Sequence, residues 1–195
     1  MGQVAGYPTV ERGISRVEVL GVDFSGAQTD NKTWVAEGVL EGGGLTLRSC
    51  RAVSRGELAE LLSSLAAPAV AALDFPFSVP MEFARYWQPE AARMPQLWAA
   101  AAAMQLDQFM ALRDAFVARC GELKRRCDTY HPESFSCLHV VNPNLVPMTF
   151  HGMRMLDKLW ASGCAVPPLE SQDAGKPVLL EAMPGAALKA LGLYE

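Results

Sequence analysis

The sequence predicts an α/β fold: a mixed five-stranded sheet with the strands in the order 3-2-1-4-5 and a helical insertion between the fourth and fifth strands. Three observations lead to this prediction. Residues 17–22 form a nearly unbroken apolar run, as expected for a central strand covered on both faces. Two strand-like segments then flank a run of glycines, and a helical pattern leads to a second apolar run. With 195 residues, half of them hydrophobic, the chain fits one domain.

The first three strands are expected to form an antiparallel meander. Residues 33–40 and 45–53 are the second and third strands, because Glu41-Gly42-Gly43-Gly44 between them suits a hairpin. Ser54 and Glu57 then have the spacing of a capping box, and leucines follow at helical intervals. The sequence therefore predicts a crossover helix directly after the third strand.

Residues 69–73 supply the fourth strand, which ends where Pro76 opposes further pairing. A right-handed crossover lays this strand parallel to the first, on the side away from the hairpin. A last short strand at 177–182 is expected beside the fourth, followed by a helix that Pro184 opens. The carboxyl ends of the first and fourth strands then border the crevice where open α/β sheets bind ligands.

Residues 80 to about 165 are predicted to be a helical insertion. Good helix formers fill residues 96–120, with Gly121 as the C-cap, and a second helix spans 150–162. Residues 127–149 between them contain three prolines and many polar side chains, which indicates an ordered loop or lid.

Composition limits the classes of function. The net charge of −4 argues against binding nucleic acid by overall electrostatics. No apolar run approaches the roughly 20 residues of a membrane span, and the start has no secretory pattern. We therefore expect a cytoplasmic protein with no membrane partner and reduced cysteines. Residues 1–15 are predicted to be a flexible segment before a single domain at 16–195.

The best functional clue is a pair of aspartates. Asp23 and Asp74 each close an apolar run at a break marked by glycine or proline, and so are predicted to stand at the ends of two strands. On neighbouring parallel strands, roughly 5 Å apart, their carboxylates would repel each other unless a cation lay between them. Mg²⁺ or Mn²⁺ suits such oxygen ligands, and Glu181 on the last strand would be the third ligand. Each acid has a simpler alternative role, capping a turn or a helix.

Several segments resemble the predicted RNase H-like nuclease family known as domain of unknown function 429. The resemblance spans most of residues 17–193 and rests on these segments: Gly21-Val22-Asp23-Phe24-Ser25-Gly26-Ala27, Ala72-Leu73-Asp74-Phe75-Pro76-Phe77-Ser78-Val79-Pro80, Arg126-Cys127-Asp128, Asn142 to Arg154, and Glu181-Ala182-Met183-Pro184-Gly185-Ala186. It implies an RNase H-like fold in which Asp23 and Asp74 bind the metal and Glu181 is a third acid. The family's activity is itself mostly inferred from fold.

This resemblance also implies a departure at the carboxyl end. Members are expected to continue into a further helix that brings another acid near the metal, whereas this chain stops at Glu195. The resemblance therefore implies a site that is short of one acid and lacks the C-terminal helix.

The same resemblance implies candidate substrate-binding residues around the predicted site. They are polar, basic or turn-forming residues that could meet a phosphate: Ser25, Gly26, Lys32, Arg126, Asp128, Thr149 and Arg154. Arg126 would hold a phosphate that Asp128 orients, unless the two residues belong to an ordinary ion pair. Thr149 and Arg154 would open a helix whose free amides welcome an anion.

The main hypothesis is metal-dependent hydrolysis of phosphodiester bonds, with nucleic acid as the partner and Mg²⁺ or Mn²⁺ as the cofactor. One alternative is an actin-like or sugar-kinase-like ATP-dependent phosphotransferase, although the chain is short for two lobes and has no second glycine-rich phosphate turn. Another is a catalytically inactive binding domain. The four tryptophans are expected to pack in the core rather than stack on bases.

Overall fold

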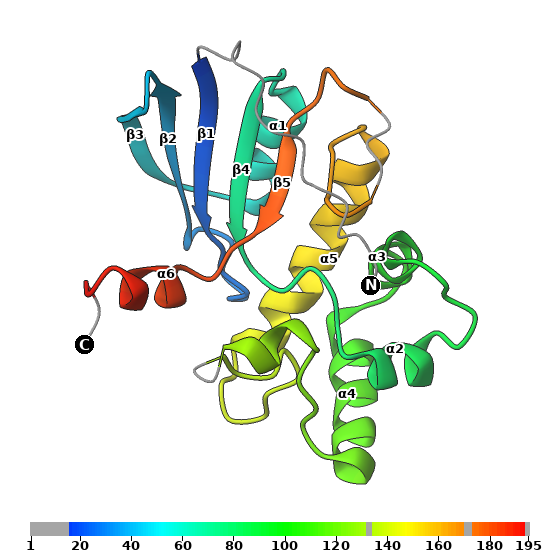
Figure 1. Cartoon of the computed structure of the whole chain (residues 1–195). Helices are drawn as coiled ribbons and strands as arrows, with labels where there is room; N and C mark the ends of the chain where they lie inside the picture. Colours follow the sequence, from blue (N-terminus) through cyan, green and yellow to red (C-terminus); the bar gives the residue numbers. More distant parts are fainter. Residues whose placement is uncertain (1–15, 132–133, 170–172, 194–195) are drawn as a thin grey trace, which may run out of the picture.

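A computed structural model describes residues 16–131, 134–169 and 173–193 of the chain, so the predicted flexible segment 1–15 lies outside the described residues. The fold is α/β, with a five-stranded sheet in the order β3-β2-β1-β4-β5 (Figure 1). The strands are β1 (Arg16–Asp23), β2 (Thr33–Glu41), β3 (Gly44–Val53), β4 (Ala69–Asp74) and β5 (Val178–Glu181). β1, β2 and β3 pair antiparallel, whereas β4 is parallel to β1 and β5 to β4. The predicted class and strand order are confirmed.

Local sequence signals explain the first half of the fold. Gly42 and Gly43 join β2 to β3 with φ values of 57° and 82°, the positive values that a type I′ hairpin turn needs. Ser54 and Glu57 form the predicted capping box: the Glu57 amide donates to Ser54 Oγ at 3.1 Å, and the Ser54 amide donates to Glu57 Oε2 at 2.7 Å. Helix α1 (Arg55–Ser64) starts at this cap and carries the chain across to β4.

The insertion contains more helices than the sequence predicted. It is built from α2 (Met81–Trp87), α3 (Met94–Ala102), α4 (Leu106–Cys120), the 3₁₀ turn η1 (Cys127–Tyr130) and α5 (Leu145–Ala161). The single helix predicted at 96–120 is wrong, because Gln108 Oε1 accepts the amide of Gln105 at 2.9 Å and starts a new helix there. Across the described ranges, no helix is both long and apolar enough to cross a membrane.

Helix α5 begins earlier than predicted, at Leu145 instead of Phe150. The sequence predicts a loop at Pro147, yet this residue lies in the first turn of α5, where backbone amides need no partner within the helix. The last five residues of the predicted loop, 145–149, are therefore helical. Gly121 follows α4 with a φ of 74°, as predicted for its C-cap.

The two faces of the sheet have different surroundings. Helices α1 and α5 lie on one face, whereas among the described residues only α6 (Pro184–Ala190) approaches the other, near the carboxyl ends of the strands (Figure 1). We call this second side the open face. In β1, Leu20 and Val22 are buried but Gly21 between them is exposed. The prediction that this strand is covered on both faces is therefore wrong, because its apolar run contains a glycine with no side chain to bury.

Helix α5 supports the turns that follow β1 and β4. A Cβ atom on Gly26 would lie 2.6 Å from the carbonyl oxygen of Asn144, next to the start of α5. A Cβ atom on Gly152 would lie 2.7 Å from Cε2 of Phe75, the residue after Asp74. Because these approaches leave no room for a methyl group, α5 fixes the positions of both strand ends.

Candidate carboxylate site

Asp23 and Asp74 are partners in the parallel ladder between β1 and β4. Paired residues of parallel strands project from the same face, and neighbouring strands lie about 4.8 Å apart. Both side chains therefore leave the open face at the carboxyl ends of the strands, with Asp23 exposed and Asp74 half-buried. We call these two residues the acid pair, and the register brings them together as the sequence suggested.

The surroundings of the acid pair disfavour a negative charge on Asp74. The pKa of Asp74 is raised to about 6, first by burial and then by the negative charges of Asp23 and Glu181. Among the described residues, no lysine, arginine or histidine forms an ion pair with either aspartate. An ionised Asp74 therefore lacks a compensating positive charge within the described chain, and a bound cation would supply one.

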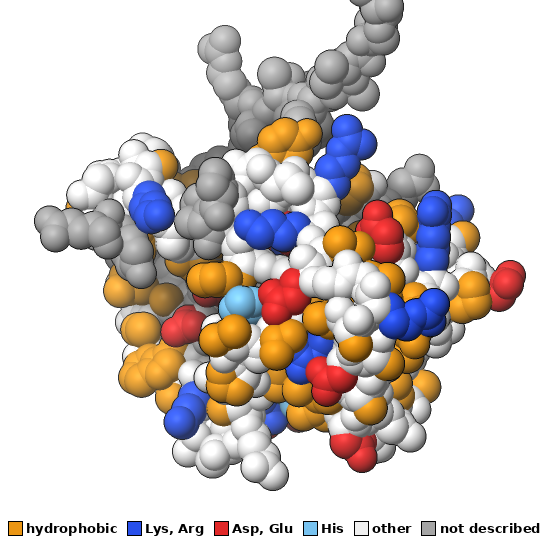
Figure 2. All heavy atoms as spheres, turned by 90° about the horizontal axis from the view of Figure 1, so that it is seen from below, with side chains coloured by type: hydrophobic (Ala, Val, Ile, Leu, Met, Phe, Trp, Pro, Cys, Tyr) orange, Lys and Arg blue, Asp and Glu red, His pale blue; other side chains and the backbone are white. Residues whose placement is uncertain are grey.

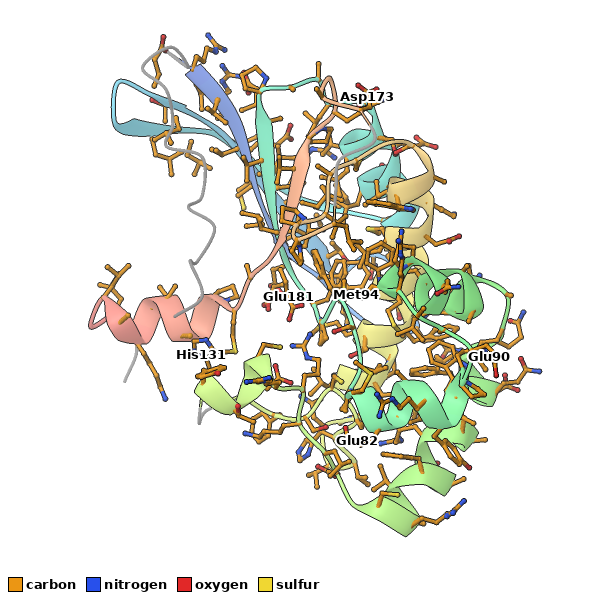
Figure 3. The ribbon with its side chains drawn as sticks, turned by 45° about the vertical axis from the view of Figure 1, so that its right-hand side comes forward. Glu82, Glu90, Met94, His131, Asp173 and Glu181 are labelled. Carbon is orange, nitrogen blue, oxygen red and sulfur yellow. The ribbon has the colours of Figure 1, made fainter. Side chains whose placement is uncertain are left out.

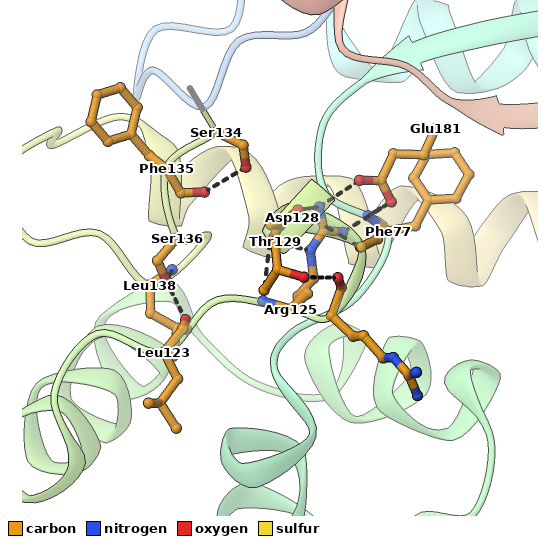
Figure 4. Close-up of polar contacts among 12 residues, drawn as sticks. Phe77, Leu123, Arg125, Asp128, Thr129, Ser134, Phe135, Ser136, Leu138 and Glu181 are labelled. Carbon is orange, nitrogen blue, oxygen red and sulfur yellow. Dashed lines mark hydrogen bonds and ion pairs between the residues drawn. The ribbon is translucent and has the colours of Figure 1, made fainter. Parts of the chain in front are cut away.

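Glu181 lies close to Asp74 but projects from the other side of the sheet. Its ladder partner is Leu73, a fully buried residue, so the pleat directs Glu181 toward the helices (Figure 3). There Arg125 donates from Nη2 to Oε1 at 2.6 Å and from Nη1 to Oε2 at 3.0 Å. The amide of Phe77 donates to Oε2 at 3.0 Å (Figure 4).

Arg125 also binds Asp128, so that one guanidinium joins two carboxylates. Nε of Arg125 donates to Asp128 Oδ2 at 2.9 Å, and Nη2 donates to Oδ1 at 2.6 Å. Arg125 and Asp128 are only 8% and 6% exposed. We call Arg125, Asp128 and Glu181 the ion-pair triad.

Arg126 is the predicted phosphate-binding arginine, but it is exposed, and Arg125 is the residue that turns inward. Two adjacent arginines before a 3₁₀ turn carry no periodicity that could have identified the inward one. Asp128 belongs to an ion pair, which was the alternative to a phosphate-orienting role, but its partner is Arg125 and not Arg126.

The structure does not arrange Asp23, Asp74 and Glu181 as the predicted metal site of three acids. In the part of the chain that the structure describes, no group of three or more His, Cys, Asp or Glu residues is arranged to hold a metal ion. Asp74 lines a hollow of about 190 Å³ together with Arg125 and Glu181, whereas Asp23 lines a groove of about 380 Å³ beside Trp34. Two carboxylates still suit Mg²⁺ or Mn²⁺, since Mg²⁺ keeps several waters and takes one or two protein carboxylates.

The turn after Asp23 owes its shape to two of the predicted substrate-binding residues. Ser25 donates its amide to Thr33 Oγ1 at 3.1 Å, and its own Oγ accepts the amide of Ala27 at 3.2 Å. Gly26 provides the close approach to α5. Lys32 is exposed and lines neither hollow of the acid pair.

Thr149 and Arg154 do not form the predicted anion site at a helix start. Because α5 begins at Leu145, Thr149 lies beyond the first turn, fully buried, and its hydroxyl donates to the Leu145 carbonyl at 2.9 Å. Arg154 lies farther along α5, over the ring of Phe150, and lines a different hollow. The prediction is wrong because it placed the helix start five residues too late.

Trp34 differs from the other tryptophans. Trp98 and Trp87 are buried as predicted, but Trp34 is 48% exposed on the open face, where it is the ladder partner of Asp23. In the view from below, the described basic side chains alternate with acidic and apolar ones instead of forming one continuous basic surface (Figure 2).

The fold and site together define an α/β protein with an antiparallel meander, two added parallel strands and a carboxylate pair at the strand ends. Comparisons with protein-family models, curated proteins and solved structures found no match to this chain.

Proposed function

We propose that this protein is a metal-dependent phosphodiesterase of the nuclease type, built on an RNase H-like fold. The observation that carries the proposal is the register pairing of Asp23 with Asp74 at the carboxyl ends of two parallel strands, on the open face. The raised pKa of Asp74, about 6, supports it, because uncompensated carboxylates cluster where a cation or a substrate is bound. The meander followed by a crossover to parallel strands is consistent with the RNase H-like fold.

In this proposal Asp23 and Asp74 would hold Mg²⁺ or Mn²⁺, which would supply charge stabilisation for a phosphoryl oxygen. Glu181 adds negative potential beside Asp74 while Arg125 fixes its side chain. The turn after Asp23, shaped by Ser25 and Gly26, holds the first carboxylate in place from the side of α5. The substrate would be nucleic acid approaching the open face.

Metal binding and cleavage are tested separately. Mn²⁺ should raise the melting temperature of the purified protein, because a ligand at about 100 times its Kd stabilises the folded state by about 2.7 kcal/mol. Asp23→Asn and Asp74→Asn should remove this rise, whereas Asp107→Asn, an acid-to-amide change in the first turn of α4, should keep it.

Cleavage of single-stranded, duplex and branched oligonucleotides is then assayed with Mg²⁺ and with Mn²⁺. Either change in the acid pair should lower the rate at least about 100-fold, since a metal-bound phosphoryl oxygen gains several kcal/mol. Wild-type protein that binds Mn²⁺ but leaves all of these substrates intact would contradict the nuclease proposal. Protein with no affinity for Mn²⁺ would contradict the metal site as well.

A further inference from the structure

A separate hollow lies on the helix side of the sheet, between α1, α5 and the turn that follows β1. Its volume is about 320 Å³, at the lower end of the range of small-molecule sites. We call it the cation pocket, and its lining residues are Asp30, Arg55, Gly56, Ala59, His151, Arg154, Met155 and Lys158.

The cation pocket carries an excess of positive charge within a chain whose net charge is −4. Three of its residues are cations, Arg55, Arg154 and Lys158, and one is an acid, so that three minus one leaves two positive charges. The acid, Asp30, balances the charge of Arg55. Its Oδ1 accepts the backbone amide of Arg55 at 2.8 Å and lies 3.3 Å from Nε of Arg55. The excess charge therefore belongs to the two cations on α5.

Uncharged groups also position Arg55 and Arg154. Arg55 donates from Nη1 to the carbonyl oxygens of Ser25 and Ala27 at 3.2 and 3.0 Å. Arg154 lies over the ring of Phe150, 5.4 Å from its centre. No ion pair joins Arg154 or Lys158 to a carboxylate in the described part of the chain.

Two backbone features favour an anion at the same place. Arg55 and Gly56 are the first two residues of α1, so the positive end of the helix dipole faces the pocket. A Cβ atom on Gly56 would meet only Ser54 Oγ, at 3.8 Å, which shows that the space beside this amide is open.

His151 lies among the cations of the pocket. Its ring is half-buried, and its pKa is lowered to about 4 by burial and by the charges of Arg55 and Arg154, against the opposing effect of Asp30. At neutral pH the ring is therefore uncharged and keeps one N–H that can donate to an anion.

We infer that the cation pocket binds a phosphate or diphosphate group, held by Arg154 and Lys158 at the start of α1. This inference does not depend on the proposed nuclease function, because no residue of the pocket belongs to the acid pair. The phosphate could come from a free anion, from a nucleotide or from a nucleic-acid strand, and the experiment separates these sources.

The test measures binding of inorganic pyrophosphate, of ADP and of a short oligothymidine by calorimetry, in the absence of divalent metal. NMR follows the titration of His151 with and without pyrophosphate. Bound pyrophosphate should raise the pKa of His151 by at least about one unit, because it neutralises the nearby guanidinium charges. An unchanged His151 titration at saturating pyrophosphate would overturn the inference.

Two pairs of variants test the location. Gly56→Asp places a carboxylate in the pocket at a helix start that tolerates acids, and should weaken pyrophosphate binding at least about tenfold. Gly56→Ala adds a methyl group at the same position without a charge, and should weaken pyrophosphate binding less than Gly56→Asp does. Lys158→Gln should weaken binding about threefold or more, whereas Lys189→Gln on α6 should not.

Pyrophosphate binding that is equal in Gly56→Asp and in wild type would contradict the assigned site. Tighter binding of ADP than of pyrophosphate would assign the phosphate to a nucleotide, and binding of the oligothymidine that Gly56→Asp abolishes would assign it to a nucleic-acid strand. Both results support the pocket and differ only in the source of its ligand. Cleavage activity does not enter this test, so its failure is distinct from failure of the proposed function.

Discussion

The acid pair and the ion-pair triad lie at the same edge of the sheet, but their charges are balanced in different ways. In the triad, Asp128 and Glu181 share the guanidinium of Arg125, with contacts as short as 2.6 Å. Asp23 and Asp74 have no ion pair with any described cation, and burial together with neighbouring charges raises the pKa of Asp74. The triad is therefore completed by the chain itself, whereas the described chain supplies no such partner for the acid pair, which we propose binds a metal ion.

The largest expected effect comes from breaking the triad. Arg125→Ala leaves Asp128 buried without its partner and should lower the free energy of unfolding by about 3 kcal/mol. Urea denaturation at pH 7.5 measures the change. Arg126→Ala, which removes the exposed neighbouring arginine, should change stability by less than about 0.5 kcal/mol. Equal losses in the two variants would show that the triad does not stabilise the fold.

A smaller effect is expected from the contact that holds the turn after Asp74. Gly152→Ala forces a methyl group against the ring of Phe75 and should destabilise the protein by about 2 kcal/mol. The matched control is Gly56→Ala in α1, where the space is open and alanine should stabilise the helix by about 0.5 to 1 kcal/mol. Thermal denaturation should show a lower melting temperature for Gly152→Ala and a higher one for Gly56→Ala. A higher melting temperature for Gly152→Ala would contradict the close packing.

Asp74→Asn should raise the free energy of unfolding at neutral pH, whereas Arg125→Ala should lower it. A pKa raised in the folded state stabilises the protein below the unfolded value, near 3.8, and this contribution is lost as the pH rises through about 6. The full shift corresponds to about 3 kcal/mol, which screening at a partly exposed group reduces to about 1 to 2 kcal/mol. The variant should therefore be more stable than wild type at pH 7.5 and equal to it below about pH 4 in urea denaturation.

The smallest effect separates the two roles of Glu181. Glu181→Gln keeps an oxygen acceptor for Arg125 but removes the charge, and should cost about 1 kcal/mol. The rise in melting temperature with Mn²⁺ should remain, because we assign the metal to the acid pair alone. Loss of that rise would make Glu181 a metal ligand, as the sequence predicts.

Much of the fold follows from local signals in the sequence. The glycine pair of the hairpin, the capping box at Ser54 and the right-handed crossover together determine the strand order. The start of α5 was missed because proline is compatible both with a loop and with a first helical turn. The division between α3 and α4 was missed because a run of alanines continues the helical pattern across it.

The site was only partly predictable. Asp23 and Asp74 could be found because strand ends are visible in the sequence, and parallel pairing then brings them together. The direction of Glu181 could not, since it depends on a register with Leu73 that β5 alone does not encode. Arg125 was missed for a similar reason, as its partner Glu181 lies 56 residues away along the chain.

Helix α5 supports the turns that follow both carboxylates. The turn after Asp23 rests on its first residues through Gly26, and the ring of Phe75 rests on Gly152 farther along the same helix. The contacts with α5 therefore support the spacing that the parallel ladder sets between the two acids. A shift of that helix would move both strand ends together, so the distance between the two carboxylates would survive small deformations of the surrounding chain.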